Sequence, residues 1–165
     1  MTTIHRIGVI SDTHIPSRAT RIPDSVLKHF ENVELILHAG DHSTLAAIRQ
    51  LEAYSPVIAV QGNVEYPEII SAVPVKREIE VGGVAVGLIH ILGEKAHYAQ
   101  TARREFPSAR VVVFGHSHIP YLTDEDGLML LNPGSATDRR FQPACTIALL
   151  EIADGAPRAR IITLP

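Results

Sequence analysis

Residue types that bind metals occur two positions apart in two short segments of the sequence. Asp12 and His14 form one pair, and His116 and His118 form the other. Residues i and i+2 of an extended segment point the same way, so each pair can direct two ligands to one spot. Histidine, of which the chain has nine, is the commonest protein ligand for metals. The two pairs therefore predict metal-dependent chemistry.

Five apolar segments end directly before polar residues of this kind. They are segments 7–10, 35–39, 57–60, 84–89 and 111–114. Ligands bind beyond the carboxyl ends of strands in open α/β sheets, so we expect these polar side chains to converge. Glycine at 40, 62 and 115 lets the backbone turn sharply before three of them. The candidate metal ligands are Asp12, His14, Asp41, Asn63, His90, His116 and His118.

Seven candidate ligands are more than one tetrahedral zinc ion can use. They suit two metals that share a carboxylate, which is the usual apparatus of hydrolytic phosphoryl transfer. Mixed imidazole and carboxylate ligands favour manganese, iron, zinc, nickel or cobalt over magnesium or calcium. Each residue alone has a structural explanation: an aspartate can cap a turn, and His90 can be a core histidine. The combination carries the prediction, because every candidate follows an apolar segment.

The elements that must position these residues alternate in the first half of the chain. Segments 7–10, 35–39 and 57–60 read as buried strands. Helical patterns lie between them, one opening at Pro23-Asp24-Ser25 and one with Ser43 as its expected N-cap. This β-α-β-α-β order predicts a parallel sheet.

The second half reads as largely antiparallel. Hairpins are expected around Gly82-Gly83 and Asp124–Gly127, and a loop over 65–73. A helix is expected over 94–106, and later strands over 111–114, 146–152 and 160–164. The predicted fold class is α/β, a mixed two-sheet sandwich with helices outside.

Length and composition narrow the class of protein. The chain has 165 residues, a net charge of −3, 45% apolar residues and one cysteine. These values predict one domain over 1–165, without a disulfide framework or a cysteine-rich zinc site. No apolar run is long enough for a membrane span, and an acidic chain is a poor candidate for a stable nucleic-acid complex. The first residues show no secretory signal, so a cytoplasmic location is expected.

The order Asp-x-His, Gly-Asp, Gly-Asn, His, Gly-His-x-His resembles that of the calcineurin-like metallophosphoesterases. The resemblance is strongest to their small YfcE-like phosphodiesterases and runs nearly end to end. It lies in segments 10–14, 37–41, 60–63, 113–118 and 131–135. It implies a four-layer α/β/β/α sandwich with a binuclear metal centre. It also implies a phosphodiesterase that acts on a small phosphate ester.

The resemblance implies a role for each candidate. One metal would take Asp12, His14, Asp41 and His118, and the other would take Asp41, Asn63, His90 and His116. Asp41 would bridge them, and a hydroxide between the metals would attack phosphorus in line. Asp41, Asn63 and His116 would be catalytic, and Asn63 and Arg139 would contact the substrate. Manganese is the expected metal, with nickel, iron, zinc, cobalt and magnesium as alternatives.

Two positions depart from the family pattern. Val64 stands where the phosphoprotein phosphatases have a histidine that donates a proton, so we expect good leaving groups to be favoured. His42 is an alternative proton donor. Ile91 replaces the usual glycine after His90, which makes His97 the alternative ligand.

Other functions stay open at this point. The same site would suit a phosphomonoesterase or a nucleotide-directed hydrolase. A non-catalytic scaffold of the same fold, like a subunit of retromer, is a further alternative, although that subunit has altered ligands. Small members of the family often form dimers or tetramers, so a homodimer or homotetramer is also considered.

Overall fold

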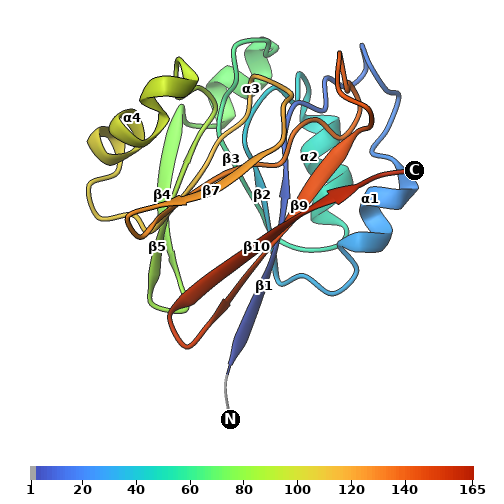
Figure 1. Ribbon diagram of the computed structural model, residues 1–165. Coiled ribbons are helices and arrows are strands. Elements are labelled where there is room, and N and C mark those ends of the chain that lie inside the picture. Colours follow the sequence, from blue (N-terminus) through green and yellow to red (C-terminus); the bar gives the residue numbers. More distant parts are fainter. Residues whose placement is uncertain (1–2) are drawn as a thin grey trace.

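Residues 3–165 form two β-sheets that pack face to face between helices in the computed structural model (Figure 1). Sheet A contains, in spatial order, β10 (Ala156–Thr163), β9 (Thr146–Ala153), β1 (Ile4–Ile10), β2 (Leu35–His38) and β3 (Val57–Ala59). Sheet B contains β4 (Lys76–Val81), β5 (Val84–Ile89), β6 (Val111–Val113), β8 (Leu128–Asn132) and β7 (Tyr121–Glu125). The helices are α1 (Asp24–His29), α2 (Leu45–Glu52), α3 (Pro67–Ala72), the 3₁₀ turn η1 (Lys95–His97) and α4 (Tyr98–Glu105).

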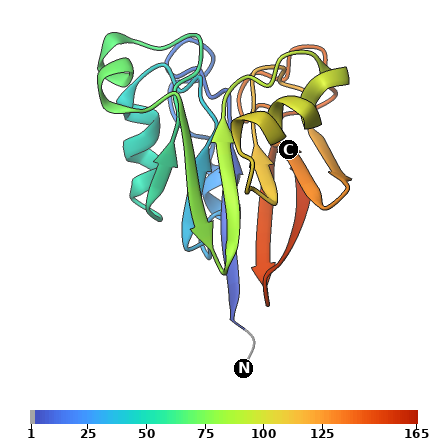
Figure 2. The same cartoon turned by 90° about the vertical axis from the view of Figure 1, so that its left-hand side faces the viewer.

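Each sheet has three parallel strands. They are β1, β2 and β3 in sheet A, and β5, β6 and β8 in sheet B. The remaining strands pair antiparallel to them. The loops that follow the parallel strands lie together at the top of the molecule (Figure 1 and Figure 2). This confirms the expected parallel order and brings the predicted ligands to one end of the fold.

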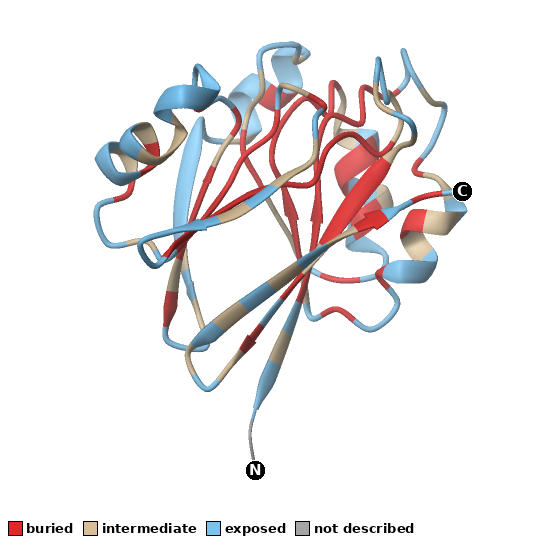
Figure 3. Cartoon of the chain, in the orientation of Figure 1, coloured by how far each residue is buried: buried red, intermediate tan, exposed pale blue. Residues whose placement is uncertain are grey.

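Three apolar interfaces separate four layers. Ile7 of β1 and Leu131 of β8 are fully buried between the sheets. Phe30 packs between sheet A and the helices α1 and α2, and Phe106 packs between sheet B and α4. The α/β/β/α sandwich is therefore confirmed. Buried residues continue from the strands into the loops above them (Figure 3).

Three local predictions were wrong. Residues 67–72 form α3, opened by Pro67 at its first position, where a loop was expected. Strand β10 begins at Ala156 rather than Arg160, because Asp154-Gly155 forms a tight turn with positive φ at both residues. Thr44 is the N-cap of α2, whereas Ser43 donates its hydroxyl to the Val64 carbonyl.

The helices of residues 3–165 are all short. The longest, α2 and α4, have 8 residues each. None approaches the length and apolar character that a bilayer crossing demands.

We expect truncation of the inter-sheet core to destabilise the protein. Leu150→Ala removes a fully buried side chain and should lower the free energy of unfolding by about 2–5 kcal/mol. Leu122→Ala, at a residue 40% exposed, should change it by within about 0.5 kcal/mol. Urea denaturation followed by circular dichroism measures both. Equal losses would contradict this description of the core.

Candidate metal centre

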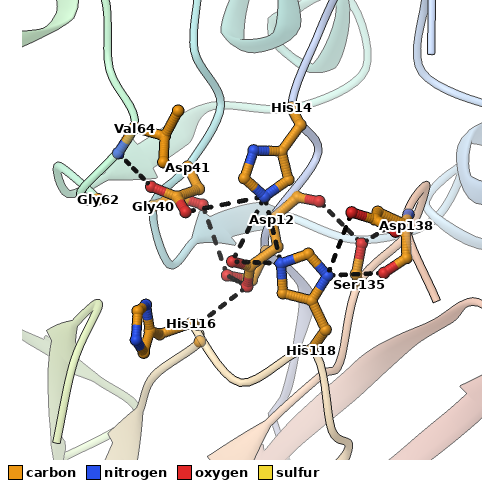
Figure 4. A network of polar contacts seen from close by, with 12 residues as sticks. Asp12, His14, Gly40, Asp41, Gly62, Val64, His116, His118, Ser135 and Asp138 are labelled. Carbon is orange, nitrogen blue, oxygen red and sulfur yellow. Dashed lines mark hydrogen bonds and ion pairs between the residues drawn. The ribbon is translucent and has the colours of Figure 1, made fainter. Parts of the chain in front are cut away.

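Asp12 lies at the centre of the polar cluster above the sheets (Figure 4). Its fully buried carboxylate accepts hydrogen bonds at Oδ2 from the Ser11 hydroxyl (2.6 Å) and the His116 backbone N–H (3.1 Å). Among residues 3–165, Oδ1 has no hydrogen-bond partner, although the Nε2 atoms of three imidazoles lie 3.3–3.9 Å away. A buried anionic oxygen surrounded by imidazole nitrogens fits a metal ligand.

Two groups of side chains could each hold a cation. They are Asp12, His14 and His118, and Asp12, Asp41 and His90. Asp41 Oδ2 also lies 3.7 Å from His14 Nε2 and 3.3 Å from His90 Nε2. Both aspartates therefore lie between the two groups, whereas the family resemblance implied that Asp41 alone would be shared. The donor set fits two cations that share a carboxylate.

Asn63 connects the remaining two candidates. Its Oδ1 lies 3.0 Å from His90 Nε2 and 2.9 Å from His116 Nδ1. Asn63 and His116 are exposed, unlike the buried members of the cluster. These two side chains therefore form the face that a substrate would meet first. His97 lies in the exposed turn η1, outside the cluster, so the structure favours His90 as the ligand.

The cluster draws its residues from both sheets. Loops after β1, β2 and β3 of sheet A carry four candidates: Asp12, His14, Asp41 and Asn63. Loops after β5 and β6 of sheet B carry the other three: His90, His116 and His118. The structure thus brings all seven predicted residues to one place, and their action as ligands stays a prediction.

Backbone carbonyls orient two of the imidazoles. His90 Nδ1 lies 2.6 Å from the Ala39 carbonyl oxygen, and His118 Nδ1 lies 2.6 Å from that of Asp138. A proton on each Nδ1 leaves the Nε2 lone pair directed into the cluster. The Nε2 atoms of His14 and His118 are 3.2 Å apart, close enough for both to contact one cation. Sequence reasoning missed Asp138, because a carbonyl contact depends on the fold and not on residue type.

Five of the seven candidates have a left-handed backbone. The φ angles of Asp12, His14, Asp41, His116 and His118 lie between 44° and 72°. Such residues are uncommon, and each costs on the order of 1–3 kcal/mol. We expected extended segments to direct each pair of ligands to one spot, and that expected backbone conformation was wrong. Tight left-handed turns, not strand alternation, aim these side chains inward.

Glycine is required where the loops meet. A Cβ atom on Gly62 would overlap the carboxylate of Asp41, and one on Gly115 would overlap the hydroxyl of Ser11. At both positions the absence of a side chain lets another loop approach the glycine closely.

Glu65 links the loops after β2 and β3. Its side chain is 1% exposed, and Oε1 accepts hydrogen bonds from the backbone N–H groups of Asp41 (2.8 Å) and Gly62 (2.9 Å). Oε2 accepts a third from the N–H of Ser43 (2.7 Å). A single buried carboxylate thus fixes the segments that carry Asp41 and Asn63.

Two buried histidines lie behind the cluster. His38 Nδ1 accepts the N–H of Gly40 (3.2 Å), and Nε2 lies 3.0 Å from the Thr13 hydroxyl. Burial, reinforced by neighbouring imidazoles, holds the pKa of His38 well below its usual value. His42 packs against the His38 ring, with Nδ1 3.0 Å from Glu65 Oε1. Because His42 is fully buried, it cannot meet a substrate, which argues against it as the proton donor.

The loop after β8 joins the two halves of the site. Asn132 Nδ2 donates to the Gly115 carbonyl (2.9 Å), and the Ser135 hydroxyl donates to that of Asp12 (2.8 Å). The Thr137 hydroxyl donates to the Thr13 carbonyl (2.7 Å). These contacts connect sheet B to the Asp12 loop.

The charges in the cluster affect its titration. Burial alone would raise the pKa of Asp41, but His90 and the Val64 N–H outweigh it and hold that pKa well below its usual value. Burial would lower the pKa of His90, but contact with Asp41 and the charge of Asp12 raise it. Burial lowers the pKa of His116, and the charges of His90 and Arg140 act in the same direction. In the metal-free protein, Asp41 is therefore ionised and His90 holds a proton more strongly than a free histidine.

The predicted substrate contact Arg139 lies at the rim. It is exposed, and its Nη1 donates to the Gln142 carbonyl of its own loop (2.7 Å). Its role toward substrate stays a prediction. Arg140 is the neighbour whose charge acts on His116, and residue type alone does not distinguish the two arginines.

Comparisons with known proteins agree with this geometry. A model of the calcineurin-like phosphoesterase superfamily domain matches residues 6–155. A probable metallophosphoesterase of Methanothermobacter thermautotrophicus is 41% identical over 147 residues, covering 87% of this chain and 84% of that protein. A phosphodiesterase of Methanocaldococcus jannaschii is 26% identical over 140 residues, covering 78% and 82%. The structure of vacuolar protein sorting 29 from Cryptosporidium parvum has a TM-score of 0.79 and 19% identity over 98% of each chain, a likeness of fold.

We expect Glu65→Gln to weaken metal binding. The amide leaves at least one of three backbone N–H groups without an acceptor, so the Asp41 loop should shift. Metal affinity, measured by isothermal titration calorimetry, should fall about tenfold to a hundredfold. Glu68→Gln is the matched control, because Glu68 accepts a backbone N–H of Leu45 at an exposed position. Equal affinities for the two variants would contradict the role of Glu65.

Metal binding should also depend on pH. A cation must displace the proton that His90 holds, so affinity should fall as the pH drops below the raised pKa of His90. Calorimetry between about pH 6 and pH 8.5, in buffers of different ionisation enthalpy, measures both affinity and proton release. Affinity that is independent of pH, without proton release, would show that His90 does not bind the metal.

Proposed function

Because the chain belongs to the calcineurin-like phosphoesterase superfamily, we propose that it is a phosphodiesterase that uses two divalent cations. The observation that carries the proposal is Asp12 Oδ1, a buried carboxylate oxygen without a hydrogen-bond partner among residues 3–165 and surrounded by imidazoles. The family and the donor set together support a metal-dependent phosphoester hydrolase. Diester specificity rests on the resemblance to small phosphodiesterases and on one relative that bears that name.

Different residues of the chain would hold each of the two cations. Asp12, His14 and His118 would hold one cation, and His90, Asn63 and His116 would hold the other, with Asp41 shared between the two. Bound cations would activate a water molecule and neutralise the oxygens of the phosphate. A donor set that mixes imidazoles with carboxylates suits manganese, iron, zinc, nickel or cobalt, and of these we propose manganese, which the family resemblance favours.

The exposed side of the cluster would meet the substrate. Asn63 Oδ1 faces two imidazoles, so its amide NH₂ is free to donate to a phosphate oxygen. His116, whose pKa burial lowers, stays a neutral imidazole near neutral pH, and this is the form that binds a cation through one nitrogen and can donate the N–H of the other. Because the pKa of Asp41 is lowered, its carboxylate stays ionised near neutral pH and can bind a cation.

Hydrolysis of bis-p-nitrophenyl phosphate tests the proposal. Protein stripped with a chelator should be inactive, and activity should return at about two Mn²⁺ per chain. Asp12→Asn should lose metal and activity together. Faster hydrolysis of p-nitrophenyl phosphate would favour a phosphomonoesterase instead. Two bound metals without hydrolysis of either ester would favour a binding protein, as in a scaffold of this fold.

Val64 leads to a prediction about leaving groups. It is 50% exposed and follows Asn63, and its side chain cannot donate a proton. Val64→His should raise the rate on alkyl diesters by about 10²-fold relative to aryl diesters, which is the lower end of general acid catalysis. Val64→Asn, which adds polarity without a titratable proton, is the control. Unchanged alkyl rates in a folded, metal-loaded Val64→His would contradict the prediction.

A further inference from the structure

A hollow of about 340 Å³ lies on the outer face of sheet A, next to the end of α1. Its volume falls within the range of small-molecule sites, about 300–1,000 Å³. Arg6 of β1 lines it, whereas Asp12 follows the opposite end of that strand. Six residues of extended chain span about 20 Å, so the hollow is separate from the metal centre.

Positive side chains gather around this hollow. The register of sheet A places Arg6, Glu151 and Arg158 side by side on β1, β9 and β10. Arg160 lies two residues along β10 and therefore on the same face as Arg158, and it lines the hollow together with Lys28 of α1. Glu151 is the acidic residue of the lining, and it already pairs with Arg6 (Nε to Oε1, 3.2 Å).

The remaining cations lack partners. Within residues 3–165, Lys28, Arg158 and Arg160 form no ion pair and no side-chain hydrogen bond. Their positive charges repel one another. This cluster of cations occurs although the chain as a whole is acidic, with a net charge of −3. Edge strands commonly carry charge to prevent sheet extension, and this would account for the two arginines of β10. It does not account for Arg6, which lies on the central strand of the sheet, or for Lys28, which lies on a helix.

The rest of the lining is apolar or neutral. Val33 is 8% exposed, and Leu149 packs against the core beneath it. Asn32 adds an amide that can donate and accept hydrogen bonds. Arginine presents a planar fork that matches phosphate, and lysine adds a point charge. The hollow thus has cations that suit a phosphate, Lys28 and Arg160, beside an apolar floor formed by Val33 and Leu149.

We propose that this hollow is a second binding site, which takes a small phosphate-bearing organic molecule. The phosphate would contact Lys28 and Arg160, and the organic part would lie on Val33 and Leu149. Oxyanion recognition alone would also admit free phosphate, so the apolar floor is the feature that favours an organic phosphate.

Titration of the ¹⁵N-labelled, chelator-treated protein with AMP and with inorganic phosphate tests the proposal. Without metal ions, phosphate cannot bind to a cation at the candidate metal centre, so binding at that centre is not mistaken for binding in the hollow. The amide resonances of Lys28, Leu149 and Arg160 should shift, and AMP should bind more tightly than inorganic phosphate. Binding should weaken in high salt, because the site is open to solvent.

Two variants locate the site. Arg160→Gln should raise the Kd for AMP about tenfold, as expected for the loss of one charged hydrogen bond. Arg49→Gln makes the same change of charge at an exposed position on α2 and should leave the Kd unchanged. Lys28→Gln repeats the test on the helix and serves if Arg160→Gln fails to fold.

Several results would overturn the proposal. They are no shifts at these amides with millimolar AMP, shifts confined to Asn63 and His116, or equal affinities for Arg160→Gln and Arg49→Gln. Equal affinities for AMP and inorganic phosphate would contradict the contact with Val33 and Leu149.

Discussion

The concentration of buried negative charge above the two sheets is the constraint on which the rest of the structure depends. Asp12 and Asp41 are at most 2% exposed, and a carboxylate without compensation is costly to bury. Imidazoles, backbone N–H groups and the Ser11 hydroxyl compensate part of that charge. Asp12 Oδ1 has no hydrogen-bond partner among residues 3–165, and a cation there would complete the compensation. The surrounding loops place their imidazoles and N–H groups where they compensate the charge of these two carboxylates.

The loops can hold these charges because fully buried strands anchor them from beneath. Left-handed residues in the site are unfavourable in isolation, and they persist only where their surroundings fix them. Parallel strands with fully buried side chains, such as Ile10 and Val113, anchor the loops from below. Glu65 and the Asn132–Thr137 segment tie them together from the side. Local strain is therefore offset by the sandwich core and by hydrogen bonds between loops.

The sequence allowed much of this to be predicted. Apolar segments that end in Asp, Asn or His predicted both the strands and the candidate ligands. Buried strands require apolar residues, whereas metal ligands are Asp, Asn or His, so the change of residue type marks the end of each strand. The carbonyl of Asp138, the three N–H groups at Glu65 and the difference between Arg139 and Arg140 could not be predicted. Each depends on backbone positions that only the folded chain defines. The start of β10 was missed although Asp154-Gly155 is a hairpin signal, and α3 was missed because its six residues are too few to show a period.

The division of the site between the two sheets has a thermodynamic consequence. A cation held by Asp12 of one sheet and His118 of the other would bind only where the sheets are packed together. Any ligand that binds the folded state alone stabilises it in proportion to the logarithm of its concentration. The free energy of the sandwich would then vary with the supply of divalent metal. Starvation for metal would loosen the interface between the sheets as well as remove the catalyst, so the lifetime of the protein would follow the availability of its cofactor.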